Sequence, residues 1–420
     1  MSETKPVLAA LQIEDRQLRI VVGQFFNNVL YILYRHTLAV HGYEGGGIYN
    51  EKVIIEAIKK ECSLIQNELK TPLESVLLCV PAYRFKKEKR TFEILLAENK
   101  VRNEDVKEIL QNAYSVKVGN DLEIINALCG SYRINGITYP KIPLNEKSGL
   151  LTAEVDLLCG DKSAVYDLVR IVEKAGLKVL NIYQDEYASC YEAALFEQSF
   201  NSYVINIHLE GSHTVYTLLY NGRIISGFND NNGYDQLIKP LVSRYGLSYR
   251  DADRLLFRYG VVGQETAEER IINRWTDNDQ VKTITYKDIQ ESIYPQCSKM
   301  IDDIYSYCSQ IIAGGNVTTF ITGQGANLQN LQEILSQKFG HTVKCYCPDT
   351  LGCREPRWTT LLGILSIYKD NMSLGFKKDE CINTDVYKQN LIVRESDLGE
   401  EKNLTGKLKS FTDKIFVEKD

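Results

Sequence analysis

The chain has 420 residues, more than one hydrophobic core usually supports, which suggests roughly two to four packed units. Its 49 basic and 55 acidic residues give a net charge of −6, so no global positive field favours nucleic acid or an anionic surface. The 11 cysteines are scattered, and neither a signal peptide nor a membrane-spanning run is apparent. We therefore expect reduced thiols in a cytosolic protein.

In the first part of the chain, β-rich runs alternate with helical patterns. This order predicts an α/β protein. The runs VLAALQI, RQLRIVVGQ and VLYILYRHTLAV predict strands, NEKVIIEAIKKECSLIQNEL predicts a helix, and SVLLCVPA predicts a further strand.

A basic stretch, RFKKEKR at 84–90, follows that last strand. It could be taken for a nucleic-acid patch, but a charge run is more often a solvated surface. We interpret it as a solvated loop that leaves a domain, and we expect no nucleic-acid partner.

A compact insert is predicted from about residue 91 to residue 158, with three strands and one helix. Asn103 is a suitable N-cap for that helix, and Glu104 and Asp105 suit the positive end of its dipole. The next helix, SAVYDLVRIVEKAGL, should end at Gly176. Strand KVLNIYQ and helical EYASCYEAALFEQ complete this part of the chain.

The second half restarts the same scheme with a β-hairpin at 203–220. Helical patterns follow, then strand TTFITG, turn GQGAN and helix LQNLQEILSQKFG. Each half thus opens with a hairpin, which is the duplicated two-lobe plan of actin-like and heat-shock ATPase nucleotide clamps. Two such turns can hold phosphates from opposite sides.

The chain resembles the FtsA family of actin-like bacterial cell-division proteins along nearly its whole length. RNEDVKEILQNA resembles the helix of the FtsA-specific subdomain 1C, and EIINALCGSYRINGITYPKIPLNEKSGLLTAEVDLL resembles its central strands. ADRLLFRYG resembles the family pattern AE-x-x-K-x-x-YG, and FITGQGANLQNLQEIL with CPDTLG resembles the glycine turn and exit of subdomain 2A. A subdomain 1C insert distinguishes this family from actin itself.

The resemblance implies an α/β, two-lobe actin-like (duplicated ribonuclease H-like) fold. It maps subdomain 1A to 1–83, 161–201 and 355–370, 1C to 84–160, 2A to 202–232 and 303–354, 2B to 233–302, a linker to 371–402 and a terminal helix to 403–420.

The first phosphate hairpin departs from the family. The family reads approximately LDIGTSK, whereas this chain has LQIEDRQ, with Gln12 for the aspartate and Glu14 for the glycine. Asp15, Arg16 and Gln17 replace the small hydroxyl residues and lysine. A phosphate cradle needs close backbone N–H groups, and Glu14 and Asp15 would repel a polyanion.

The second hairpin departs as well. Where the family reads approximately VVDIGGGTTD, this chain has VINIHLEGSH, with Asn206 at the aspartate and His208, Leu209 and Glu210 at the three glycines. We therefore expect ATP and Mg²⁺ to bind weakly or not at all, and we expect no enzyme beyond a weak ATPase.

Some nucleotide-site positions of the family are retained or altered. In ADRLLFRYG the glutamate is shortened to Asp253 and the lysine is Leu256. The TGQGAN turn is also what a strand-to-helix turn with positive φ requires. The candidate residual ATP site comprises Gly323, Gln324, Gly325, Ala326, Gly233 and Asp253.

Two sets of residues have the side-chain types of an acid–base or metal site. In the second hairpin, strand alternation would place His208 and Glu210 on one face and His213 on the other, as an acid–base or metal site. A second set, His341, Cys345, Cys347 and Cys353, has ligand types but no paired C-x-x-C, so a structural zinc site is disfavoured and no metal is predicted.

The end of the chain predicts an amphipathic helix after a polar tether. Its apolar residues could lie in the headgroup plane with lysines near anionic lipid, as in the short anchor that ends FtsA proteins, or could dock on the protein itself. The stripe comprises Leu404, Leu408, Phe411 and Ile415, with Phe416 beside it.

These features predict a cell-division adaptor at the cytoplasmic side of the plasma membrane, at the division site. The resemblance implies FtsZ, whose C-terminal tail would dock on subdomain 2B, and self-association. Two alternatives stay open: an actin-like scaffold of the type IV pilus system that binds a partner's tail, and an actin-fold ATPase or kinase. The basic candidates for FtsZ binding are Arg250, Arg254 and Arg258, with Arg244 nearby.

Overall fold

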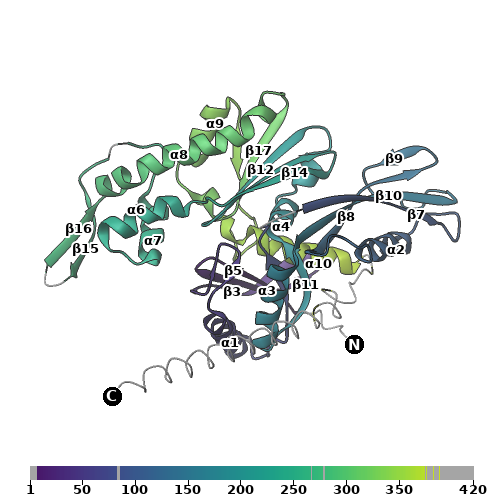
Figure 1. The fold of residues 1–420 in the computed structure, drawn as a ribbon, viewed down its shortest axis with the longest axis horizontal. Coiled ribbons are helices and arrows are strands. Elements are labelled where there is room, and N and C mark those ends of the chain that lie inside the picture. Colours follow the sequence, from purple (N-terminus) through teal and green to yellow (C-terminus); the bar gives the residue numbers. More distant parts are fainter. Residues whose placement is uncertain are drawn as a thin grey trace, which may run out of the picture. The chain divides into compact units, whose positions relative to one another are not determined.

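The computed structural model describes residues 7–82, 86–265, 267–277 and 280–373, together with residues 375, 382 and 387. The chain divides into a compact unit, 1–378, and a second unit, 379–420. All helices and strands named below belong to the first unit (Figure 1).

The first lobe is built on a five-stranded sheet in the order β11-β6-β1-β2-β3. The strands β1, β2 and β3 pair antiparallel, and β6 and β11 extend the sheet in parallel. All residues of β1 after Val7 are buried, as expected for a strand covered on both faces. The strands are β1 Val7–Glu14, β2 Gln17–Phe26, β3 Val29–Ala39, β6 Ser75–Val80 and β11 Lys178–Gln184.

The second lobe repeats this topology with the sheet order β18-β17-β12-β13-β14. The strands β12, β13 and β14 pair antiparallel, and β17 and β18 extend the sheet in parallel. This duplication confirms the predicted two-lobe α/β fold. The strands are β12 Tyr203–Leu209, β13 Thr214–Tyr220, β14 Arg223–Asp230, β17 Val317–Thr322 and β18 Val343–Cys345.

Helices cover both sheets, and several begin at side-chain caps that the sequence supplies. Asp161 caps α3 by accepting from the N–H of Ala164 at 3.0 Å, and Thr285 with Asp288 forms a capping box at the start of α8. Figure 1 shows α8 running from the hairpin of β15 (Ile271–Asp277) and β16 (Gln280–Thr285) toward the second-lobe sheet. The helices are α1 Glu51–Leu69, α3 Lys162–Lys174, α4 Asp185–Glu192, α5 Leu195–Gln198, α6 Asp235–Tyr245, α7 Tyr249–Tyr259, α8 Tyr286–Ile312, α9 Leu331–Phe339 and α10 Thr359–Ser373.

Short elements complete the lobes. They are β4 Tyr43–Glu44, β5 Gly47–Ile48, the hairpin β15 Ile271–Asp277 with β16 Gln280–Thr285, and the 3₁₀ turns η1 Gln324–Asn327 and η2 Pro356–Trp358. Among the described helices, none is long and apolar enough to cross a membrane. The cysteines that the structure describes are free thiols.

The insert is a four-stranded sheet, β7-β10-β8-β9, with α2 packed on one face around its own core. The prediction of a solvated loop at 84–90 is wrong from residue 86 onward, because β7 begins there and pairs along β10. Lys89 lies 2.9 Å from the Glu154 carboxylate, so alternate lysines are neutralised across the strand pair. The elements are β7 Lys86–Leu95, α2 Asn103–Tyr114, β8 Leu122–Ile134, β9 Ile137–Tyr139 and β10 Leu150–Asp161.

One arginine fixes the insert to the second lobe. Arg223, the first residue of β14, binds both carboxylate oxygens of Asp156, at 3.0 Å through Nε and 2.6 Å through Nη2. Its Nη1 donates to Glu154 at 2.6 Å. A Cβ on Gly130 would lie 2.3 Å from Nε of Arg223, so glycine leaves the room that the guanidinium occupies. The insert is therefore held by both lobes.

Candidate functional site

The turn between β1 and β2 meets the turn between β12 and β13 through one buried arginine. Nη2 of Arg19 lies 3.1 Å from Oε2 of Glu14 and 3.0 Å from Oε2 of Glu210. The same nitrogen donates to Oε1 of Gln324 at 2.8 Å. The Arg19 side chain is 0% exposed. Because Glu14 belongs to the first lobe and Glu210 and Gln324 to the second, this guanidinium links the two lobes.

The two carboxylates around Arg19 differ in their proton affinity. Burial, only partly offset by Arg19, raises the pKa of Glu14 to about 8. Burial also opposes ionisation of Glu210, but Arg19 and His208 hold the pKa of Glu210 below its ordinary value. At neutral pH the cluster therefore holds one guanidinium, one ionised carboxylate and one protonated carboxyl group. Its net charge is close to zero.

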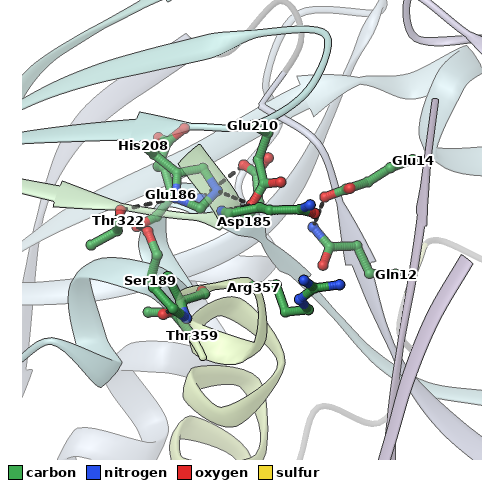
Figure 2. Close-up of polar contacts among 12 residues, drawn as sticks. Gln12, Glu14, Asp185, Glu186, Ser189, His208, Glu210, Thr322, Arg357 and Thr359 are labelled. Atoms are coloured by element: carbon green, nitrogen blue, oxygen red, sulfur yellow. Dashed lines mark hydrogen bonds and ion pairs between the residues drawn. The ribbon is translucent and has the colours of Figure 1, made fainter. Parts of the chain in front are cut away.

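Amide side chains complete the first-lobe half of this cluster. Gln12 donates to Oε1 of Glu14 at 2.5 Å, and Gln17 donates to Oε2 of Glu14 at 2.9 Å. Figure 2 shows Gln12 and Glu14 on one side of the site, with Glu210 and His208 on the other. The pairing of Gln12 with Arg19 and of Glu14 with Gln17 across β1 and β2 places these polar side chains at the end of the hairpin.

A second arginine of the same hairpin reaches the other lobe nearer the surface. Arg16 binds Asp235 at 3.0 Å and Glu44 at 3.3 Å, and its guanidinium lies 4.7 Å from the centre of the Tyr249 ring. Tyr249 donates its hydroxyl hydrogen bond to the same Asp235. A pocket of about 250 Å³ lies beside this contact, with Arg16, Asp235 and Lys239 in its lining.

A second buried polar network lies on the second-lobe side. His213 Nε2 lies 3.3 Å from Asp185, whose pKa is held below its ordinary value by His213 despite complete burial. His208 Nδ1 lies 2.9 Å from the Thr322 hydroxyl group. Burial lowers the pKa of His208, so this imidazole is neutral near pH 7. Figure 2 shows His208, Thr322 and Asp185 together in this network.

Glu186 stands out among the buried carboxyl groups. Within the described part of the chain, neither of its side-chain oxygens has a hydrogen-bond partner. Burial raises the pKa of Glu186 well above its ordinary value, and the neighbouring Asp185 raises it further. A protonated Glu186 costs less to bury than a carboxylate, so this residue is neutral in the folded chain.

The two histidines of the second hairpin contact different carboxylates. His208 Nε2 lies 3.7 Å from Oε1 of Glu210, whereas His213 turns to Asp185. Within the described residues, however, no group of three or more histidines, cysteines or carboxylates could hold a metal ion. The residues without such a group include His341, Cys345, Cys347 and Cys353. The His341 ring instead forms a hydrogen bond with the Thr319 hydroxyl group at 3.0 Å.

The candidate nucleotide-site residues gather around the second hairpin turn. A Cβ on Gly233 would lie 2.1 Å from the carbonyl oxygen of Glu210, and one on Gly325 would lie 2.3 Å from the Leu209 side chain. Gly323 has φ of 80°, which favours glycine. Close packing and backbone conformation thus account for these glycines. Gln324 and Ala326 are buried beside them.

Asp253 lies on α7 near the same cluster. Burial raises the pKa of Asp253 to about 6, and the positive charge of Arg357 opposes that rise. The three arginines of α7 are exposed and spaced four residues apart on one side of the helix; they are Arg250, Arg254 and Arg258. The terminal stripe of Leu404 to Phe416 lies outside the described residues.

This residue set does not fit an ATP–Mg²⁺ complex. A polyphosphate between the two turns would meet Glu14 and Glu210, and would have to separate Arg19 from both. The positive charge that a metal ion would supply is already supplied by the guanidinium. The arrangement can join the lobes and bind protons, because its carboxyl groups have perturbed pKa values.

Curated cell-division proteins are similar to this chain along most of its length. The FtsA of Bacillus subtilis (strain 168) is 23% identical over 387 residues, which cover 88% of this chain and 86% of that protein. The FtsA of Enterococcus hirae is 22% identical over 374 residues, covering 86% of this chain and 83% of that protein. The chain is a divergent FtsA-like protein of the actin family. No protein-family model matches it.

Solved structures agree with the FtsA-like assignment at the level of fold. The PilM–PilN type IV pilus biogenesis complex gives a TM-score of 0.58 at 12% identity, covering 87% of this chain and 98% of that chain. MreB 5 of Spiroplasma citri bound to AMPPNP gives a TM-score of 0.50 at 11% identity, covering 89% of this chain and 100% of that chain. Both are actin-like, as predicted.

Arg19 and Asp185 were missed by the sequence-based reasoning on this FtsA-like chain. Arg19 lies in an apolar run, LRIVVG, where a charged side chain is either at an edge or buried with a partner. The alternation of Gln12 and Glu14 on the facing strand was the available signal, because strand pairing brings their side chains to one face. Asp185 gave no signal, since its partner His213 lies 28 residues away.

We expect Arg19→Met to lower the free energy of unfolding by about 3–5 kcal/mol, because it leaves buried carboxyl groups without their cation. Adding Glu14→Gln and Glu210→Gln to Arg19→Met should recover most of the loss. Urea unfolding of the single, double and triple variants measures this coupling. A single variant as stable as the wild type would show that Arg19 does not hold the lobes together.

The pKa of Glu14 predicts a pH dependence of stability. The folded chain keeps a proton on Glu14 up to about pH 8, whereas the unfolded chain loses it near the ordinary value of 4.5. The contribution of Glu14 to the free energy of unfolding is therefore fully present below the pKa of the unfolded chain. It is lost as the pH rises through the pKa of the folded chain, at up to about 1.4 kcal/mol per pH unit.

The side chain introduced by Glu14→Gln cannot titrate. The free energy of unfolding of this variant, relative to that of the wild type, should therefore increase between pH 6 and pH 9. Urea midpoints of both proteins across that range give the difference, in which groups common to both proteins cancel. Parallel pH profiles would mean that Glu14 titrates normally.

Proposed function

We propose that this FtsA-like chain is a cell-division adaptor that links the FtsZ ring to the cytoplasmic side of the plasma membrane. The observation that carries the proposal is the sequence match: curated cell-division proteins are 20–23% identical over 85–88% of the chain. The solved structures cover as much of the chain, 87–89%, but at only 11–12% identity, so they support the fold and not this function.

We further propose that the adaptor works without a bound nucleotide. The support is physical: Arg19, Glu14 and Glu210 form a buried ionic contact where an actin-like protein would hold phosphates. A link made of side chains needs neither ATP nor Mg²⁺. On this proposal the chain is not an enzyme, or at most a weak ATPase.

The membrane contact is assigned to the terminal helix proposed from sequence at 403–420. A single short amphipathic helix binds a bilayer marginally, and Asp413 and Glu418 weaken its attraction to anionic lipid. Self-association would then be needed for stable attachment, because several weak anchors on one assembly bind by avidity.

The FtsZ tail is assigned to α7 in the proposed subdomain 2B. Arg250, Arg254 and Arg258 form an exposed basic row, in which Arg254 pairs with Asp251 at 3.2 Å and Arg258 lies over the Tyr259 ring. An acidic peptide could compete with Asp251 for Arg254, since exposed pairs of this kind are weak.

A fluorescent fusion tests the adaptor function in dividing cells of the native host. We expect a midcell band that disappears when residues 403–420 are deleted or when Phe411→Glu charges the apolar stripe. Thr412→Glu, off the stripe, is the matched control and should keep the band. Diffuse fluorescence in every version would redirect the function toward a pilus-type scaffold with a soluble partner.

Calorimetric titration with Mg-ATP tests the nucleotide-free site. We expect no binding tighter than about 100 μM, which is about −5.5 kcal/mol, because phosphates would have to break the Arg19 contact. Low-micromolar affinity would show that the site opens for nucleotide.

Charge reversal tests the basic row. Arg254→Glu should weaken binding of an FtsZ tail peptide at least threefold, with Lys299→Glu on α8 as the charge-matched control. Equal affinity of Arg254→Glu and the wild type would place the docking site elsewhere.

A further inference from the structure

An aromatic cluster lies on the surface of the second lobe, where β13, β14 and α8 meet. The ring of Tyr307 lies 4.9 Å from that of Tyr216 and 4.8 Å from that of Phe228, and Tyr216 and Phe228 are 6.2 Å apart. Tyr216 is buried, but Phe228 is 49% and Tyr307 is 42% exposed. Large aromatic side chains held together in water mark a contact surface more often than a solvated one.

The cluster borders a free strand edge. β14 is the last strand of its sheet, and Ile225 to Phe228 are all exposed. At the start of the strand, Lys87 of the insert donates to the Ile224 carbonyl oxygen at 2.5 Å. From Ile225 onward, no described residue outside the sheet bonds the backbone of β14. This edge offers backbone donors and acceptors to an added strand.

The edge of β14 also lacks the features that usually protect such strands. The segment IISGF contains no charged residue and no proline, whereas the insert's edge strand β7 carries several lysines. Exposed edges without charge are pairing sites for extended chains.

Carboxylates beside the aromatic cluster determine which kind of peptide could pair with β14. Asp230 lies two residues after Phe228 on β14, and Asp303 lies one helical turn before Tyr307 on α8, so both carboxylates are next to the aromatic cluster. Neither carboxylate takes part in an ion pair with a described residue, in contrast to Asp302, which binds Lys338 at 2.8 Å. Basic side chains are therefore the complement of this surface, over the rings and beside the two carboxylates.

We propose that the edge of β14 binds an extended basic peptide from a partner protein by strand addition. Its backbone would pair with β14, an apolar side chain would cover Phe228 and Tyr307, and flanking lysine or arginine side chains would meet Asp230 and Asp303. This proposal goes beyond the adaptor function and does not rest on it.

A second copy of the chain suits this edge less well than a foreign peptide. The basic strand β7 is already paired along its length with β10, and Lys87 and Lys89 face Asp156 and Glu154 of the same chain. These two lysines of β7 are thus already paired within their own insert.

Fluorescence anisotropy on the full chain tests the proposal with a labelled RVRFRVR-amide probe. The charge-reversed EVEFEVE-amide is the control for strand formation without basic groups. We expect saturable binding of the basic probe, at least tenfold weaker or absent binding of the acidic probe, and weaker binding as salt rises.

Variants locate the binding. The double variant Phe228→Ala with Tyr307→Ala should bind the basic probe at least tenfold more weakly than the wild type. Asp230→Asn with Asp303→Asn should weaken binding of this probe about fivefold at low salt. Ile225→Lys adds a protecting charge on an exposed side chain, so it should also weaken binding while leaving the fold intact. Leu95→Lys and Glu146→Gln, on the exposed surface of the insert, are the controls and should bind as the wild type does.

Three results would overturn the proposal. Equal binding of both probes would show unspecific association, and wild-type affinity in Ile225→Lys would place the contact elsewhere. If sedimentation shows a dimer that Ile225→Lys dissociates and the probe does not bind, the edge is an interface between copies.

Discussion

The Arg19 guanidinium between Glu14 and Glu210 is the contact on which the relation of the two lobes depends. A buried cation loses its hydration, at a cost of several kcal/mol, and only nearby carboxylates with good geometry can offset that loss. One of these carboxyl groups lies 191 residues away in sequence, on the other lobe. Arg19 can therefore be satisfied in the folded chain only while the two hairpin turns are together. The raised pKa of Glu14 follows from the same burial, because one cation does not balance two carboxylates.

The same type of contact recurs wherever separately folded parts of the chain meet. Arg16 joins the first hairpin to Asp235, and Arg223 joins the second lobe to Asp156 of the insert, with Gly130 leaving space for its guanidinium. Arginine suits this role because its planar fork binds a carboxylate through two nitrogens and so fixes direction as well as distance. The hydrophobic clusters hold each part together, and the arginine contacts set how the parts meet.

The sequence predicted the fold well because hydrophobic periodicity and turn residues are local signals. Both hairpins, the insert and the glycine turn at Gly323 follow from such patterns. The basic stretch before Thr91 was misjudged because its lysines are neutralised by β10, about 65 residues later, which no local pattern reveals. The substituted hairpins were recognised, but the arginine contact between them was not. Arg19 can be identified as a lobe-joining residue only when the distance to Glu210 is known.

Because the cation between the lobes is part of the chain, the ways in which this contact can be controlled are limited. In a nucleotide clamp, the group that joins the lobes can be hydrolysed or exchanged, so the joint can be broken on each cycle. Arg19 is covalently part of β2 and cannot leave. The joint can weaken only if the charge on its partners changes or if an outside contact separates the lobes at a cost of several kcal/mol. Proton loss from Glu14 supplies the first route, since its pKa of about 8 lies near cellular pH. On the proposed adaptor function, partners and membrane would supply the second route, which is why we assign control of this FtsA-like chain to its surfaces.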